Sequence, residues 1–191
     1  MTMHVAMKDF AQDGLLAGKA EGKAVFAHLV QLTKNPPQPD VCFLDFSGID
    51  IATTSFLRES IVAYRTYVRR EYPNVYPIAA NLSSRARDDL ELILELRSDA
   101  YVVCVLSPDG EPSDVELLGQ LDGKQLIALD AVLEAGEADA PTLAERNDEG
   151  VGATAWNNRL VALADKGILI ATNAGRTKLY RPVLEGLRHG S

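Results

Sequence analysis

The sequence lacks the long apolar runs that a membrane protein needs. No stretch of 18 or more consecutive apolar residues occurs among its 191 residues, so no transmembrane helix is predicted. The first residues, MTMHVAMKDFAQDG, do not contain the unbroken apolar segment of a signal peptide. We therefore expect a soluble protein of the cytoplasm with no membrane partner.

Cysteine and histidine are scarce, which argues against metal sites and disulfide frameworks. Cys42 and Cys104 are the two cysteines, and each lies in a short apolar run where a thiol is usually an inert core residue. His4, His28 and His189 lie far apart and show no ligand spacing. We expect no bound metal ion.

Recognisable catalytic motifs are missing as well. The GKAEGK stretch at residues 18–23 does not have the spacing of a phosphate-binding loop. Asp45 and Asp50 flank one loop, and the sequence places neither a histidine nor a second carboxylate cluster beside them. We therefore predict that the protein is not an enzyme and carries no cofactor. An uncharacterised enzyme is the weakest of three functional hypotheses.

The charge is unevenly distributed along the chain. The formal net charge is −8, yet residues 151–191 hold six Lys and Arg against two Asp and Glu, a balance of +4. Residues 1–150 therefore carry −12. A basic segment attached to an acidic body is a feature of small DNA-binding modules, although a solvated charged face would give the same count.

The first half alternates the patterns of strands and helices. Apolar runs predict strands over Val41–Phe46, Val75–Ala80 and Ala100–Leu106, and a weaker one near Met3–Lys8. Apolar residues at helical spacing predict helices over Lys19–Thr33, Phe56–Arg70 and Ser84–Arg97. Pro77 interrupts one strand, which should start late or lie where one amide is not needed. The alternation predicts an α/β domain over residues 1–106, with a parallel or mixed sheet built from right-handed crossovers.

Residues 107–121 are predicted to link two domains. The SPDGEP stretch at residues 107–112 is rich in turn formers. Ser113 and Glu116 then match the capping-box pattern that starts many helices. We expect a linker followed by a short helix over Asp114–Leu121, with the domain boundary between Leu106 and Asp122.

The second half predicts three helices and a β-hairpin. The helices cover Lys124–Ala135, Asp139–Asn147 and Ala153–Lys166, with a turn over Asn147–Gly152. Two β-like runs, Ile168–Thr172 and Thr177–Arg181, are joined by a loop at residues 173–176. In the third helix, Trp156, Leu160 and Leu163 recur at spacings of 4 and 3 and so form its packing face.

Residues 122–191 resemble the winged helix-turn-helix family, most clearly in GVGATAWNNRLVALADKGILIATNAGRTKLY. The resemblance implies that the third helix enters the major groove of double-stranded DNA, while the hairpin, or wing, meets phosphates or the minor groove. The expected DNA contacts are Thr154, Asn157, Asn158, Arg159, Arg176, Lys178 and Arg181. Asparagine suits this role because it can bond adenine bidentately. Winged helices also bind proteins, so a protein partner is the alternative.

The first half resembles the STAS-like family, relatives of sulfate transporter and anti-sigma factor antagonist domains, in VCFLDFSGIDIATTSFLRES. Aligned without gaps to the antagonists' Asp-Ser-Ser-Gly motif, Ser55 falls on the serine that a partner kinase phosphorylates and Thr54 on the one before it. Thr53 and Phe56 replace the aspartate and the glycine. The resemblance implies that Ser55, with Thr54 beside it, is a candidate regulatory phosphosite. Alternatively, Thr54 or Ser55 caps the helix that follows.

These observations lead to two main hypotheses. The first is a DNA-binding transcriptional regulator whose STAS-like domain is an interaction or sensing half. The second is a partner-switching regulator of the anti-sigma antagonist type, in which the winged helix binds protein. A regulatory protein or kinase is the expected partner of the STAS-like domain. Because single winged helices read short half-sites, we also expect a homodimer.

Overall fold

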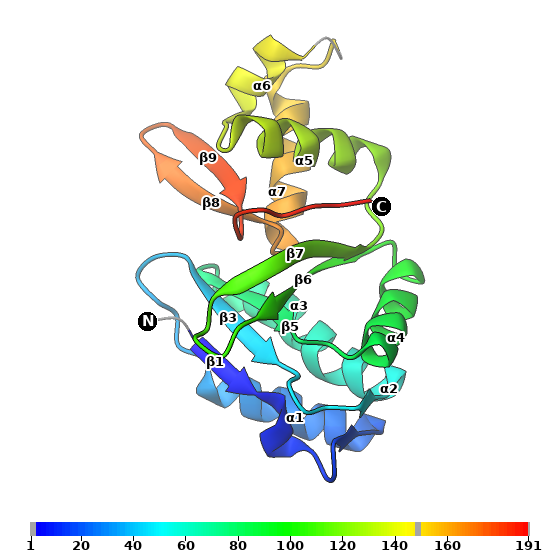
Figure 1. The fold of residues 1–191 in the computed structure, drawn as a ribbon. Coiled ribbons are helices and arrows are strands. Elements are labelled where there is room, and N and C mark those ends of the chain that lie inside the picture. Colours follow the sequence, from blue (N-terminus) through cyan, green and yellow to red (C-terminus); the bar gives the residue numbers. More distant parts are fainter. Residues whose placement is uncertain (1–2, 148–149, 191) are drawn as a thin grey trace.

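A five-stranded sheet forms the centre of the computed structural model, which describes residues 3–147 and 150–190 (Figure 1). Its strands, in spatial order, are β1 (Met3–Ala6), β3 (Asp40–Asp45), β5 (Val75–Ala80), β6 (Ala100–Leu106) and β7 (Pro112–Gly119). The first four are mutually parallel, and β7 runs antiparallel to β6. The predicted α/β class with a mixed sheet is confirmed.

Helices connect the parallel strands, as the alternating patterns predict. They are α1 (Lys19–Leu32), α2 (Thr54–Leu57), α3 (Ala63–Glu71) and α4 (Ser84–Glu95). A π-helical segment, Arg58–Val62, joins α2 to α3 without a break, so the helix predicted over Phe56–Arg70 is present as one continuous helical stretch with a π-helical segment inside it. A 3-10 turn, Met7–Phe10, follows β1, and β2 (Leu15–Leu16) pairs with β4 (Ile51–Ala52). Since the strands follow chain order across the sheet, right-handed crossovers place these helices on one face.

The helix predicted over Asp114–Leu121 is wrong, because residues 112–119 form the edge strand β7. Tyr101 of β6 lies opposite Leu118 of β7, and Val103 lies opposite Glu116. Without β7, the backbone N–H and C=O groups along the outer side of β6 would have no partners. This long-range pairing, together with burial of Val115 and Leu118, outweighs the local capping pattern.

The free edge of β7 is itself covered by the end of the described chain. The Leu117 amide donates to the Arg188 carbonyl at 2.8 Å, and the Arg188 amide donates to the Val115 carbonyl at 3.0 Å. In Figure 1 this terminal segment, coloured red, crosses above β7. Covering an edge strand in this way removes a template for pairing with another chain.

Pro77 is accommodated inside β5 without loss of a sheet hydrogen bond. It lies opposite Cys42 of β3, whereas pairing between β5 and β6 begins only at Ala79, opposite Val103. The strand therefore does not need an amide at Pro77 on the β6 side. This explains why β5 keeps its full predicted length.

Residues 122–190, here called the C-terminal unit, follow the predicted order of three helices and a hairpin. Its elements are α5 (Gly123–Ala135), α6 (Ala140–Arg146), α7 (Ala153–Asp165), β8 (Leu169–Ala174) and β9 (Thr177–Pro182). The side chains of Asp122 and Asp139 cap α5 and α6, and Gly136, with φ of 75°, ends α5. Residues 148 and 149 of the predicted turn over Asn147–Gly152 lie outside the described residues.

The sheet and the C-terminal unit share one hydrophobic core. Helices α1 to α4 pack on one face of the sheet, around Leu44 and Tyr101. On the other face, Phe43, Tyr76 and Val102 belong to the same buried cluster as the side chains of α5 and α7. Figure 1 shows the C-terminal unit lying above the sheet. Within residues 3–147 and 150–190, none of the helices has the length and apolar composition needed to cross a membrane.

A polar junction also ties α7 to the α/β part. Asp99, in the loop before β6, forms ion pairs with buried Arg65 of α3 and, at 2.9 Å, with Lys166 at the end of α7. Burial raises the pKa of Asp99, but the charge of Arg65 and the hydrogen bond and charge of Lys166 outweigh it, so this pKa is lower than usual. Arg69 of α3 donates to the Ala164 carbonyl at 3.2 Å and stacks over Tyr76.

Candidate nucleic-acid interface

A shallow hollow of about 410 Å³ separates the start of α7 from the tip of the β8–β9 hairpin. We call it the hairpin hollow. It is lined by Ala140, Pro141, Ala153, Thr154, Asn157, Arg176, Thr177 and Lys178. Four of the seven residues predicted to contact DNA are therefore neighbours in space, although about 20 residues separate the two pairs in the chain.

The amphipathic pattern of α7 decides which of its side chains face solvent. Trp156, Leu160 and Leu163 are fully buried in the shared core. Thr154 and Asn157 lie on exposed positions of the same helix, as does Asn158. Among the described residues, no side chain caps the helix start at Gly152, and a helix start favours anions because of its backbone amides and dipole.

The hairpin is fixed against α7 by Tyr180. This β9 residue is buried, and its backbone exchanges two hydrogen bonds with Ala138, at 2.9 and 3.0 Å. Its hydroxyl donates to the Asn157 side-chain oxygen at 3.3 Å. Since an amide oxygen has two lone pairs, Asn157 keeps one acceptor site and both N–H donors while its orientation is held.

The basic residues of the hairpin project from its exposed surface. Arg176, Lys178 and Arg181 are all exposed, and the first two line the hairpin hollow whereas Arg181 does not. Arg159 is half-buried, with its guanidinium 5.0 Å from the ring centre of Trp156. Asn158 and Arg159 are also outside the lining of the hollow. Three of the predicted contacts are therefore not part of this cluster.

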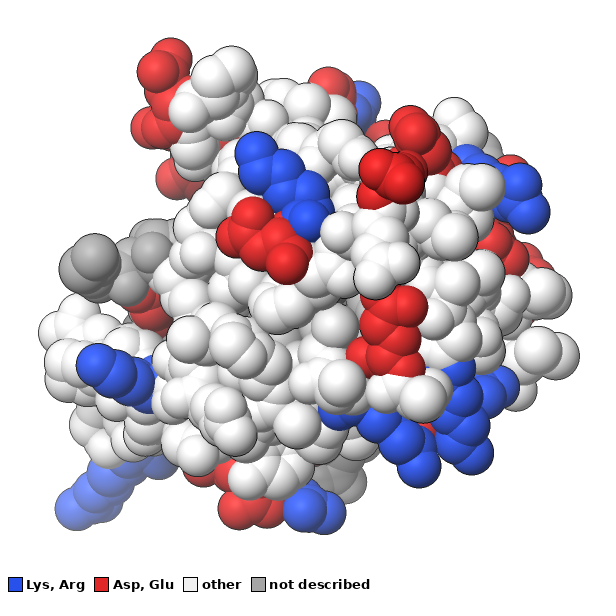
Figure 2. All heavy atoms as spheres, turned by 90° about the horizontal axis from the view of Figure 1, so that it is seen from below, with Lys and Arg blue, Asp and Glu red and all other residues white. Residues whose placement is uncertain are grey.

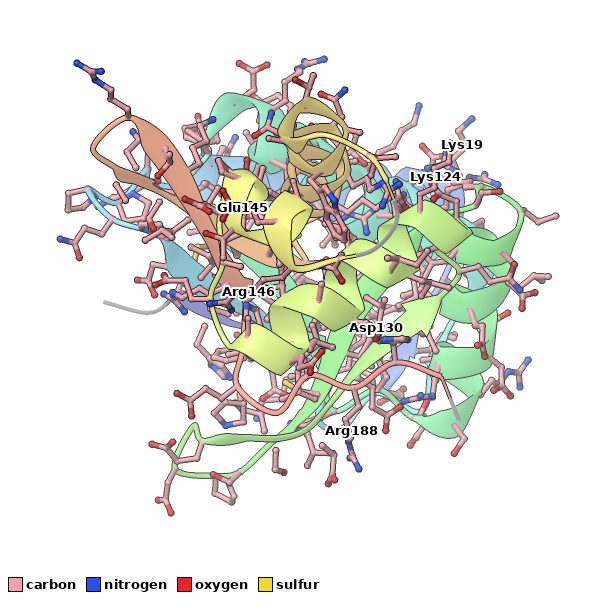
Figure 3. The ribbon with its side chains drawn as sticks, turned by 90° about the horizontal axis from the view of Figure 1, so that it is seen from above. Lys19, Lys124, Asp130, Glu145, Arg146 and Arg188 are labelled. Atoms are coloured by element: carbon pink, nitrogen blue, oxygen red, sulfur yellow. The ribbon has the colours of Figure 1, made fainter. Side chains whose placement is uncertain are left out.

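Asp130 of α5 is not part of the hairpin hollow. In Figure 3, Asp130 lies on the side of α5 that faces away from α7. There its carboxylate pairs with His189 at 2.5 Å. Among the described residues, those that line the hollow include two cations and no carboxylate. The charge of these described lining residues is thus positive, in a protein whose net charge is −8.

The candidate phosphosite lies at the start of α2, but the helix cap is Thr53, so the predicted cap at Thr54 or Ser55 is wrong. The Thr53 hydroxyl accepts from the Phe56 amide at 3.4 Å and from the Gly18 amide at 3.2 Å. The Thr54 hydroxyl donates to Asp89 of α4 at 3.0 Å. Ser55 is half-buried, with its hydroxyl 3.3 Å from that of Thr53. A phosphate on Thr54 would repel the Asp89 carboxylate.

The cap assignment can be tested by stability measurements. We expect Thr53→Ala to lower the free energy of unfolding by about 0.5–2 kcal/mol, because two amides lose their acceptor. Ser55→Ala, the matched control, should change it by less than about 0.5 kcal/mol, because no amide depends on that hydroxyl. Urea denaturation of both variants measures the difference. A larger loss in Ser55→Ala than in Thr53→Ala would contradict the assignment.

A second polar cluster lies where the parallel strands end. The Asp45 carboxylate accepts hydrogen bonds from Ser47 and from Asn81, and His4 lies 3.2 Å from it. Burial raises the pKa of Asp45, but the hydrogen bonds from Asn81 and Ser47 dominate and lower it below its usual value. Sequence reasoning missed His4 as the partner of Asp45. His4 lies in β1 opposite Phe43 of β3, so its contact with Asp45 depends on the pairing of two strands that are distant in the chain.

This cluster borders a hollow of about 810 Å³, which we call the strand-end hollow. Its walls come from β3, from the loop at residues 107–111 and from Leu184 of the C-terminal unit. Val41, Phe43 and Leu106 supply apolar surface, and Asp45 and Asn81 supply polar groups. Clefts at the carboxyl ends of parallel strands are common binding sites for small molecules.

Both cysteines are buried and unpaired, as predicted for inert core residues. Burial raises the pKa of each thiol to about 12, so neither is a ready nucleophile at neutral pH. Among the described residues, no group of three or more His, Cys, Asp or Glu side chains could hold a metal ion. In comparisons with protein-family models, curated proteins and solved structures, no match to this chain was found.

Proposed function

We propose that the protein is a DNA-binding transcriptional regulator and that its C-terminal unit is a winged helix-turn-helix. In this proposal α7 is the recognition helix and the β8–β9 hairpin is the wing. The observation that carries it is the hairpin hollow, where Thr154 and Asn157 of α7 lie beside Arg176 and Lys178 of the hairpin. The side chains that we propose to read bases and to bind phosphates therefore line one hollow.

The chemistry of this surface suits duplex DNA. The major groove admits an α-helix, and an asparagine side chain can bond adenine through its oxygen and its N–H group. Tyr180 restricts the orientation of Asn157 through its hydrogen bond, so less conformational freedom would be lost on binding. Arg176 and Lys178 would neutralise phosphates of the flanking backbone, which supplies affinity that does not depend on sequence.

The α/β part would serve as the sensing or interaction half. The strand-end hollow supports this role, because Leu184 of the C-terminal unit contributes to its wall beside strand residues. A small molecule bound there would touch both parts of the chain. Differential contacts of that kind are what a ligand needs to shift a conformational equilibrium.

DNA binding can be tested with a duplex selected from a random library. We expect Asn157→Ala to weaken binding to the selected site by about 1–3 kcal/mol, with little effect on random duplex. Arg176→Ala or Lys178→Ala should weaken binding to both duplexes and flatten the salt dependence by about one unit each. Fluorescence anisotropy across a salt series measures both effects.

Lys124→Ala is the matched control for Lys178→Ala. Figure 3 places Lys124 at the start of α5, on the opposite side of the C-terminal unit from the hairpin. Lys124→Ala should leave the DNA affinity and its salt dependence close to those of the wild type. The proposal fails if the wild-type protein binds no duplex even at about 50 mM salt, where phosphate contacts are strongest.

A further inference from the structure

A second basic area lies beside the C-terminal end of α7. A hollow of about 590 Å³, here called the α3 hollow, is lined by Arg65, Thr66, Arg69, Arg70, Arg97, Asp99, Ala162, Asp165 and Lys166. An adjoining hollow of about 360 Å³ shares Thr66, Arg70 and Arg97 with it. Five cations and two carboxylates thus surround the α3 hollow, so its local charge is positive. Seen from below, the α/β end has one gathering of basic side chains amid scattered acidic ones (Figure 2).

Some cations of the α3 hollow are held by partners within the protein, and others could bind an external anion. Arg65 and Lys166 are paired with Asp99. Arg69 donates to three backbone carbonyls. Arg70 is exposed, and within residues 3–147 and 150–190 its side chain pairs only with that of its neighbour Glu71, at 2.8 Å on the surface. Arg97 is exposed, and among the described residues its side chain has no hydrogen-bond or ion-pair partner. Arg70 and Arg97 are therefore the groups that could receive an anion.

The α3 hollow and the hairpin hollow flank α7 on opposite sides. Asn157, on one flank, is hydrogen-bonded to the hairpin through Tyr180. Ala162 and Lys166, on the other flank, face α3. The exposed strip between the flanks carries Asn158, which lies about halfway round the helix from the buried Leu160 and Leu163 side. A helix seated in the major groove by this strip would bring a cationic set toward each of the two backbones that border the groove.

The dimensions agree with that arrangement. The 13 residues of α7 span about 20 Å at 1.5 Å per residue, and the major groove is about 12 Å wide. Arg176 and Lys178 lie at the N-terminal end of α7, and Arg70 and Arg97 lie at its C-terminal end. A helix lying obliquely across the groove therefore has a cationic pair at each end, one pair for each strand of the duplex.

We propose that Arg70 and Arg97 of the α/β part form a second phosphate-binding site, which contacts the DNA strand opposite to the one that the hairpin meets. This inference rests on the proposed function and extends it, because it makes the α/β part a direct contributor to DNA binding. Arginine suits the role, since its guanidinium can bond a phosphate through two parallel N–H groups. The exposed Asp165 at the hollow would limit how deeply a phosphate enters.

The test is the double variant Arg70→Gln/Arg97→Gln, compared with a matched control in which the same charge is lost elsewhere. Arg85 and Lys8 are exposed residues of the α/β part that line none of the hollows described above, so Arg85→Gln/Lys8→Gln is that control. The probe is a duplex of about 30 base pairs, and the readout is fluorescence anisotropy across a salt series. Thermal melts confirm that both variants are folded.

We expect Arg70→Gln/Arg97→Gln to weaken binding about tenfold to hundredfold at 100 mM salt and to lower the salt slope by about two units. The control should stay within about threefold of the wild type, because distant exposed charges are screened. If Arg70→Gln/Arg97→Gln binds like the wild type while Arg176→Ala/Lys178→Ala loses affinity, the inference is overturned and the proposed function stands. Equal losses in the arginine variant and its control would also overturn it. Failure of the wild type to bind any duplex would overturn both.

A second arm assigns the strands. Neutral methylphosphonate linkages are placed on one strand of the duplex at a time, next to the selected site. Neutralising the strand bound by Arg70 and Arg97 should remove the effect of Arg70→Gln/Arg97→Gln and leave the effect of Arg176→Ala/Lys178→Ala intact. If one strand accounts for both effects, the opposite-strand arrangement is wrong.

Discussion

Replacing Asp99 by alanine is expected to lower the free energy of unfolding by about 3–5 kcal/mol. Its carboxylate holds the guanidinium of Arg65, which is 4% exposed, and the ammonium group of Lys166. Without Asp99, the Arg65 charge stays buried with no carboxylate partner among the described residues, and its remaining contacts are the Ala100 carbonyl and the ring of Tyr101. The junction between α3 and the end of α7 would loosen as well. Chemical denaturation of the wild type and of Asp99→Ala at neutral pH measures the loss.

The pH dependence gives this prediction a second readout. Because the pKa of folded Asp99 is below its usual value, its contribution is fully present above the unfolded pKa of about 3.9 and is lost as pH falls through the folded pKa. The stability difference between wild type and Asp99→Ala should therefore shrink in strong acid. Asp109→Ala, in the exposed loop before β7, is the control and should change stability by about 0.5 kcal/mol or less. If Asp99→Ala leaves the free energy of unfolding unchanged, the junction between α3 and α7 does not contribute to stability.

Gly119→Ala is expected to lower the free energy of unfolding by a similar amount, about 2–5 kcal/mol. Gly119 ends β7 with φ of +90°, a conformation that is unfavourable for residues with a Cβ. A Cβ there would lie 2.4 Å from the Asp99 carbonyl oxygen and 2.8 Å from the Leu94 Cβ. Left-handed strain of about 1–2 kcal/mol and overpacking of about 1–3 kcal/mol would add together.

Gly110→Ala separates the two terms. Gly110 has a similar φ of +83°, but no atom lies within 4 Å of the position that its Cβ would take. Gly110→Ala should therefore lower the free energy of unfolding only by the left-handed backbone strain, about 1–2 kcal/mol. Thermal melts of both variants test the difference between them. If the two variants are destabilised equally, β7 moves away from the Asp99 loop in Gly119→Ala and the predicted overpacking does not occur.

The sequence predicted most of the α/β fold because its signal is local. Continuous apolar runs identified β3, β5 and β6, and helical spacing identified α1 and α4. In the C-terminal unit, the helix starts predicted at Lys124 and Asp139 lie within one residue of those observed, Gly123 and Ala140. These patterns depend on neighbours within a few residues, which a sequence displays directly.

The failures involve partners that are distant in the chain. Strand β7 exists because β6 needs a partner and because Arg188 pairs with its other side. The pairing of His4 with Asp45 depends on two strands lying side by side. Local patterns carry no information about such contacts. DNA binding, homodimer formation and phosphorylation of Ser55 stay predictions.

The shared core has a consequence for protein engineering. A DNA-binding domain that folds alone can be fused to a new sensor domain through a flexible linker. Residues 122–190 differ, because they present an apolar surface that packs against Phe43, Tyr76 and Val102 of the sheet. A chimera that joins this segment to an unrelated sheet would expose that surface and invite aggregation. Useful grafts would have to replace loops that lie away from the shared core, such as the exposed turn at residues 108–111. Because both parts of the chain pack against the same sheet, neither can be exchanged without the other.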